Sequence, residues 1–152
     1  MEFSEITKKY WTEEDWGGLD TANSYTDLYV IAERVISKMP KPFIQVCGPI
    51  STGGLGSIPA NLDMFNKTIK ELQSKGLDIF DQMPFEKSME RLSKELREKG
   101  IYDHSILTDF YYPLFSSGHI CAFYFMPDWE SSKGARWEHD VAKELGIEIV
   151  YL

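Results

Sequence analysis

Apolar residues follow two alternating patterns from residue 43 to the end of the chain. Short continuous runs rich in β-branched and aromatic residues predict strands at 43–47, 77–80, 119–126 and 147–152. Between them, apolar residues three or four positions apart predict helices over 62–75, 89–99, part of 104–115, and 135–145. This alternation predicts an α/β fold, a Rossmann- or flavodoxin-like three-layer sandwich around a parallel sheet of four to five strands.

The first 42 residues are predicted to form an N-terminal arm and a helix ahead of an α/β domain at 43–152. Residues 1–22 are polar, acidic and aromatic, and Gly17-Gly18 is expected to break any helix there. A flexible arm, a lid and a strap at a subunit interface all remain open as interpretations. We expect Trp11 and Trp16 to bury against another part of the protein.

Composition excludes several partners. The formal net charge is -8 and no dense basic patch is present, so we expect no nucleic acid partner. Without an apolar run of about 20 residues or a signal-peptide core, we expect no membrane association and a cytoplasmic location. Cys47 and Cys121 lie in strand-like runs, are predicted to be buried reduced thiols, and have no zinc spacing. We therefore expect no metal, and structural roles for the three histidines.

Three unusual loops follow the first three predicted strands: "CGPISTGG", "DQMPFE" and "MPDWESSKG". Because the carboxyl ends of parallel strands meet at one edge of a sheet, where ligands bind in such folds, these loops are expected to converge on a site.

The first of these loops is rich in glycine and hydroxyl groups. Such a loop can present backbone N–H groups to a phosphate or a sugar, although an ordinary strand-to-helix loop is equally consistent with it. It lacks the lysine of a P-loop and the third glycine of the dinucleotide fingerprint, which disfavours a nicotinamide cofactor even though Asp81 follows at a suitable distance. The candidate ligand-binding residues here are Gly48, Pro49, Ile50, Ser51, Thr52, Gly53 and Gly54.

Glu138 lies in the predicted helix that follows the third loop, and it is the most informative residue there. Ala135, Val141, Ala142 and Leu145 share its helical face, which should pack against the protein. A carboxylate on an inward face is costly unless it is paired or used in chemistry. A pairing with an arginine or a place at the domain edge is the alternative.

Other residues beside Glu138 also fit a site. Ser131 or Ser132 is placed to cap the Glu138 helix, and Gly134 allows close approach of a ligand. Asp109, ahead of the third strand, is a second candidate acid, with a solvated aspartate at a helix end as the alternative. Trp129 is a candidate for stacking on a base, with core or rim packing equally consistent.

These segments resemble the nucleoside 2-deoxyribosyltransferase-like superfamily. The similarity covers roughly residues 43–152 and is carried by "CGPI" at 47–50 and "PDWESSKGARWEHDVA" at 127–142. The first loop is also similar to the phosphate loop of that family's deoxynucleoside 5′-monophosphate hydrolases. The resemblance implies cleavage of N-glycosidic bonds without a cofactor, in a homo-oligomer (a dimer or larger).

The resemblance also implies roles for particular residues. Glu138 takes the place of the glutamate that attacks the anomeric carbon, and Asp109 matches best the aspartate that assists at the sugar or base. Ser132 corresponds to the serine that contacts the 5′ group. The segment 48–54 would line the sugar or phosphate, and Met83-Pro84 would wall the base.

The resulting prediction is hydrolysis, or less favourably 2-deoxyribosyl transfer, of nucleosides or their 5′-monophosphates. The transferases complete a neighbour's site with a C-terminal extension, whereas this sequence ends at Leu152. The alternative is a non-catalytic module of the same fold that binds or senses nucleotides. Cytokinin-riboside-monophosphate phosphoribohydrolases are disfavoured because their "PGG-GT--E" signature is absent.

Overall fold

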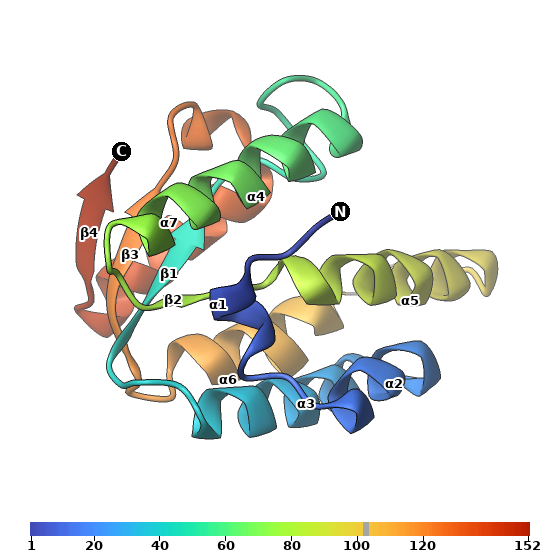
Figure 1. Ribbon diagram of the computed structural model, residues 1–152. Helices are drawn as coiled ribbons and strands as arrows, with labels where there is room; N and C mark the ends of the chain where they lie inside the picture. The colour runs from blue at the N-terminus through green and yellow to red at the C-terminus, as the bar shows by residue number, and fades with distance from the viewer. Residues whose placement is uncertain (102–103) are drawn as a thin grey trace.

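A computed structural model describes residues 1–101 and 104–152 and shows the predicted α/β architecture (Figure 1). Within this part of the chain, four parallel strands form one sheet in the order β2-β1-β3-β4. Helices cover both faces of the sheet, so the predicted three-layer Rossmann- or flavodoxin-like sandwich is confirmed. The strands are β1 (Phe43–Cys47), β2 (Ile79–Phe80), β3 (Ile120–Phe125) and β4 (Glu148–Tyr151).

The long helices begin where local chemistry predicts. Ser24, Ser57 and Ser132 each precede a helix, and each side chain accepts a hydrogen bond from the backbone N–H three residues on. Gly146, with φ of 68°, ends the last of them in the left-handed conformation that favours glycine. The long helices are α3 (Tyr25–Ser37), α4 (Ile58–Ser74), α5 (Glu86–Glu98) and α7 (Lys133–Leu145).

Side chains of β1 alternate between two hydrophobic clusters. Ile44 and Val46 face a cluster with α4, whereas Phe43 and Cys47 face a larger cluster on the other side of the sheet. Figure 1 shows α4 on one side of the sheet and α3 with α6 (Tyr112–Phe115) on the other. The candidate site therefore rests on two separately packed layers.

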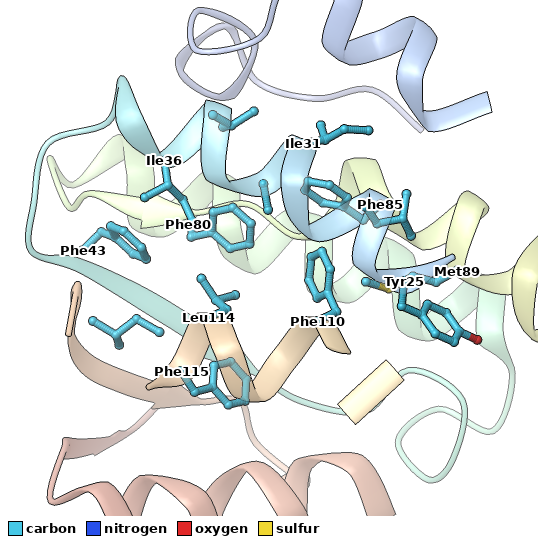
Figure 2. Close-up of a cluster of buried hydrophobic side chains, with 14 of the residues drawn as sticks. Tyr25, Ile31, Ile36, Phe43, Phe80, Phe85, Met89, Phe110, Leu114 and Phe115 are labelled. Atoms are coloured by element: carbon cyan, nitrogen blue, oxygen red, sulfur yellow. The ribbon is translucent and has the colours of Figure 1, made fainter. Parts of the chain in front are cut away.

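Aromatic rings dominate the larger cluster. Figure 2 shows Phe80, Phe85 and Phe110 directed toward one another, and the Phe85 and Phe110 ring centroids are 5.1 Å apart. Phe110 belongs to a π-helical segment, η2 (Leu107–Tyr111), that continues into α6. Pro113 is the second residue of α6 and directly follows the change from π-helical to α-helical geometry.

The expectation that Gly17-Gly18 breaks any helix is wrong. Both glycines lie inside α2 (Glu13–Thr21), which follows the short α1 (Glu5–Lys8). A capping box between Thr12 and Asp15 starts the helix, and Asp15 also accepts a hydrogen bond from Arg34 Nε of α3 at 2.8 Å. A Cβ on Gly18 would lie 3.0 Å from Ile31 Cδ1, so a small residue lets α2 approach α3.

Residues 1–22 are packed against the α/β domain. Trp11 is buried, as expected, with its ring 4.3 Å from that of Trp16 and 5.2 Å from that of Phe85. Thr7 Oγ1 donates a hydrogen bond of 2.8 Å to the buried Asp81 carboxylate, directly after β2. The segment thus supports the loop that leaves the second strand.

Two local features differ from the sequence expectation. The second strand is shorter than 77–80, because only Ile79 and Phe80 pair with β1. Cys121 is exposed rather than buried, although Cys47 is buried as expected. The pairing of β3 with β1 shifts register between Phe43 and Ile44, so Cys121 falls at an irregular point where its thiol donates to the Phe43 carbonyl at 3.4 Å.

No helix within the described ranges combines the length and the apolar character needed to cross a membrane.

Candidate functional site

A cavity of about 360 Å³ lies at the carboxyl ends of β1, β2 and β3. Each of the three loops predicted to converge supplies residues to it, together with α5, η2 and the first turns of α7. In Figure 2, Tyr25 and Met89, which also line the cavity, lie together at one end of the aromatic cluster. The residues that matter for the chemistry are Gly48, Ser51, Gln82, Glu86, Arg97, Tyr111, Ser132, Trp137 and Glu138.

Glu138 lies on α7 in the position that the helical pattern predicts. Ala135, Val141 and Ala142 are buried on the same face, and the Glu138 side chain lines the cavity. Burial, together with the charge of Glu86, raises the pKa of Glu138 to about 8, against the opposing effect of a hydrogen bond with the Cys47 thiol. Glu138 is therefore an acid held in a poorly solvated cavity rather than a surface carboxylate.

Glu86 is the second acid of the cavity. It is the first residue of α5 and ends the "DQMPFE" segment after β2. Burial raises its pKa to about 7, with hydrogen bonds from Gln82 and Tyr111 acting to lower it and the nearby charges of Asp81 and Glu90 acting to raise it. Glu86 is not among the candidate residues that the sequence motifs indicate. The signal was its place at the end of a loop already expected to reach the site.

The charge balance of the cavity favours neutral acids. Among the lining residues that the structure describes, Arg97 is the only cation, and it lies 11 positions after Glu86, about 16 Å along α5. No cationic residue of this lining therefore lies close enough to stabilise the charged forms of Glu86 and Glu138. Near neutral pH such a pair retains a proton, which is the condition that general acid catalysis requires.

Asp109 does not lie in this cavity. Its exposed carboxylate accepts a hydrogen bond from Thr108 Oγ1 and faces a separate, smaller pocket that Lys99 also lines. The reason is the helical geometry of η2: with Phe110 in the core and Tyr111 toward the cavity, the residue before them points to solvent. The structure thus brings Glu86, and not Asp109, to the same cavity as Glu138.

The first loop divides into two parts. Gly48, Ile50 and Ser51 line the cavity. Thr52 and Gly54 instead hold the third loop: Lys133 N–H donates to Thr52 Oγ1 at 2.9 Å, and Gly54 N–H donates to Ser131 Oγ at 2.8 Å.

Glycine is required in that second part by close packing. A Cβ on Gly53 would overlap the Ser131 carbonyl oxygen, and Gly53 has a φ of 68°. A Cβ on Gly54 would lie 2.6 Å from that of the buried Pro49. The Asn61 amide further binds the Ile50 and Gly53 carbonyls. Residues 52–54, which were expected to bind a phosphate or a sugar, therefore join the first loop to the third.

The expected wall for a base is also different. Met83 and Pro84 are buried in a 3-10 turn, η1 (Met83–Phe85), and do not line the cavity. Trp129 stacks on His139 with ring centroids 4.3 Å apart, beside Tyr151 of β4. The aromatic residues that do line the cavity include Tyr111 and Trp137. The signal for Trp137 was present, since it directly precedes Glu138 on α7.

Ser132 and Gly134 lie at the cavity as expected. Ser132 is buried, and its Oγ accepts a hydrogen bond of 3.2 Å from Ala135 N–H, so it caps α7. Gly134 has open space around it, since a Cβ added there would have Ser132 Oγ as its nearest neighbour, at 3.9 Å. The start of α7 therefore offers room for a ligand group beside Glu138.

Asp81 is bonded to neighbouring residues and lies outside the cavity. Its carboxylate accepts hydrogen bonds from Thr7 Oγ1 and from Met83 N–H, and it does not line the cavity. Among residues 1–101 and 104–152, no group of three or more His, Cys, Asp or Glu side chains is arranged to hold a metal ion. What the cavity offers is a pair of carboxyl groups, hydroxyls, amides and aromatic walls.

Comparison with known proteins adds one match. Residues 116–151, which include β3, α7 and Glu138, match the family described as a domain of unknown function (DUF4406). The matched segment is less than half of the chain. No curated protein and no solved structure matches the chain.

Proposed function

We propose that this protein cleaves the N-glycosidic bond of nucleosides or nucleoside 5′-monophosphates, with Glu138 as the nucleophile and Glu86 as the general acid. The observation that carries the proposal is that both carboxyl groups line one cavity of about 360 Å³ at the carboxyl edge of the sheet. The partial burial of both acids, which raises their pKa values, and the sequence resemblance described above support it.

The chemistry needs one charged and one neutral acid. The Glu138 carboxylate attacks the anomeric carbon and forms a glycosyl-enzyme, while the bond from that carbon to the base nitrogen breaks. The electron pair of that bond goes to the base, which takes a proton from Glu86. Water then attacks the anomeric carbon, gives its proton to Glu86, and releases the sugar and the Glu138 carboxylate.

The substrate itself decides which acid holds the negative charge. Coupled acids titrate as a pair, so a single proton belongs to the site rather than to one residue. Positive charge that develops on the sugar over Glu138 stabilises the carboxylate there and leaves the proton on Glu86. The raised pKa values, about 8 for Glu138 and about 7 for Glu86, keep that proton available near neutral pH.

The test is release of free base. We expect the wild-type protein to release base from at least one member of a panel of ribo- and deoxyribonucleosides and their 5′-monophosphates, followed by chromatography. Glu138→Gln should abolish release, whereas Glu144→Gln, an exposed glutamate on the same helix, should leave it unchanged. If neither the wild type nor Glu138→Gln releases base but a nucleotide raises the Tm of both, the binding module replaces the enzyme.

The homo-oligomer that the resemblance implies and the cytoplasmic location expected from the sequence stay predictions. Light scattering coupled to size-exclusion chromatography of the purified chain tests the first of them.

A further inference from the structure

We propose that Gln82, oriented by Gln45, is a positioning residue that determines which oxygen of Glu86 accepts a hydrogen bond and which carries the proton. The inference rests on the proposed function of Glu86 as the acid. It concerns two glutamine amides that bridge the centre of the sheet and the cavity wall.

The hydrogen bonds that run from Gln45 through Gln82 to Glu86 form a relay. The Val46 backbone carbonyl sets its direction. Gln45 Nε2 donates to the Val46 carbonyl at 3.2 Å and to Gln82 Oε1 at 2.6 Å, and Gln45 is fully buried. A carbonyl oxygen only accepts hydrogen bonds, so the Gln45 amide must turn its NH₂ group toward it. The opposite orientation would place Gln45 Oε1 against the acceptor of Val46. In the observed orientation, Gln45 Oε1 has no hydrogen-bond partner among the described residues.

The orientation of Gln45 then fixes that of Gln82. Because Gln82 Oε1 accepts from Gln45, the NH₂ group of Gln82 has to point the other way. It donates to Glu86 Oε1 at 3.1 Å and to the Tyr111 hydroxyl oxygen at 3.3 Å. All four N–H bonds of the two amides are thereby committed.

The consequence for Glu86 is chemical. An oxygen that accepts an N–H hydrogen bond is favoured as the carbonyl oxygen of a neutral carboxyl group, so the proton of Glu86 resides on Oε2. The Tyr111 hydroxyl also accepts from Gln82, and its own single proton is shared between Glu86, whose pKa it lowers, and Met89 Sδ at 3.5 Å. The acid is thus presented with one fixed donor oxygen rather than two interchangeable ones.

The effect of the Gln82–Glu86 hydrogen bond can be measured in the pKa of Glu86. Asp81 and Glu90 raise the pKa of Glu86 by their charges, and Glu138 lines the same cavity. Against burial and these carboxylates, the hydrogen bonds from Gln82 and Tyr111 are the interactions that favour its charged form. Loss of the Gln82 donor should therefore move the titration of Glu86 to higher pH.

The first experiment needs no substrate. Carboxyl ¹³C NMR on protein labelled at glutamate follows Glu86, assigned with Glu86→Gln, between pH 4 and 10. Gln82→Met, which fills similar space without donors, should move the midpoint upward from about 7 by roughly one pH unit. Gln45→Met should move it in the same direction. Asn66→Leu, at a buried amide on α4 bonded to the Glu2 carbonyl, is the control and should leave it unchanged.

The second experiment uses the base-release assay. Gln82→Met should lower kcat about 10- to 100-fold while KM stays within about twofold, because a misplaced acid affects the chemical step. In a Glu86→Gln background, the same substitution should have no further effect on kcat.

These two experiments fail in different ways. An unmoved Glu86 midpoint in Gln82→Met overturns the relay, whatever the activity. Full additivity of Gln82→Met with Glu86→Gln also overturns it while leaving the glycosidase proposal intact. An inert wild type overturns the proposed function, and the NMR titration still decides whether Gln82 orients Glu86.

Discussion

Glu86 and Glu138 each lie in a setting that opposes their negative charge. Burial raises the pKa of Glu138 to about 8 and that of Glu86 to about 7, and the charge of Glu86 contributes to the effect on Glu138. In an unfolded chain a glutamate ionises near about pH 4.3. Acids whose pKa is raised on folding contribute stability below their unfolded pKa, and that contribution is lost as the pH rises to the folded value. These two acids therefore lower the free energy of unfolding increasingly as the pH rises from about 4.5 to 8.

The free energy of unfolding should reveal this cost. Between pH 5 and pH 8 we expect Glu138→Gln to lose less stability than the wild type, by roughly 2–4 kcal/mol after allowance for partial exposure to the cavity. Urea denaturation at the two pH values measures the difference. Glu144→Gln, exposed on the same helix, should follow the wild type, and a parallel loss in Glu138→Gln would contradict the assignment.

Activity should depend on pH in a bell-shaped manner. Below about pH 7 both acids are protonated and no nucleophile is available, whereas above about pH 8 both are charged and no acid is available. A profile of kcat/KM from pH 5 to 10 should therefore have its maximum between these values. A rate that is constant from pH 5 to 7 would show that Glu138 is already ionised there.

The structure and the sequence resemblance point to different residues as the general acid, Glu86 and Asp109 respectively. We expect Glu86→Gln to lower kcat by about 10²–10⁴-fold, the usual contribution of a general acid. Asp109→Asn, at an exposed residue outside the cavity, should stay within about twofold of the wild type. Steady-state kinetics on the best substrate of the panel tests both. The reverse ranking would restore the role that the resemblance gives to Asp109.

At the scale of elements, the first loop and the start of α7 act as one unit. The Thr52 hydroxyl and the Gly54 N–H bind the backbone of Lys133 and the hydroxyl of Ser131, respectively. Gly53 passes so close to Ser131 that no side chain fits between them. This contact holds the first loop against the start of α7, the helix that carries Glu138, so it contributes to the shape of the site.

Two glycines of the same loop test this contact. Gly53→Ala should destabilise the protein by about 1–3 kcal/mol more than Gly56→Ala and should weaken substrate binding. Both glycines have positive φ, so both substitutions carry backbone strain, but a Cβ on Gly56 would meet nothing within 4 Å. Thermal denaturation and KM measure the difference. Equal effects would mean that strain alone, and not loop contact, requires Gly53.

At the scale of the whole molecule, residues 1–22 complete the core under the second loop. Trp11 packs its ring against Phe85 of η1, directly before Glu86, and Thr7 binds Asp81. The segment therefore supports the wall of the cavity from behind. Its effect on the site is indirect, through the position of the residues that follow β2.

Substitution of Trp11 tests that support. We expect Trp11→Ala to lower the free energy of unfolding by about 3–5 kcal/mol, the usual cost of removing a buried tryptophan. Ile6→Ala, in α1 of the same segment but 42% exposed, should cost less than about 0.5 kcal/mol. Chemical denaturation measures both. A small effect of Trp11→Ala would show that the segment packs independently of the core.

Short-range patterns in the sequence are enough to specify several parts of this protein. Alternating strand and helix periods specify the parallel α/β sandwich, and the Ser132 cap with its following apolar face orients Glu138 inward. The convergence of three loops follows from parallel topology alone. These predictions hold because each rests on neighbours within a few residues or on the geometry shared by all such sheets.

Which side chains meet in the site depends on how the elements pack. Asp109 lies outside the cavity because packing of Phe110 fixes the rotation of η2, whereas Glu86 lines the cavity from the start of α5. Gly17 and Gly18 stay helical because α2 packs on α3 and a capping box starts it, which outweighs a low helix propensity. Packing between elements contributes to each of these outcomes, and the helical and strand periods of the sequence do not encode it.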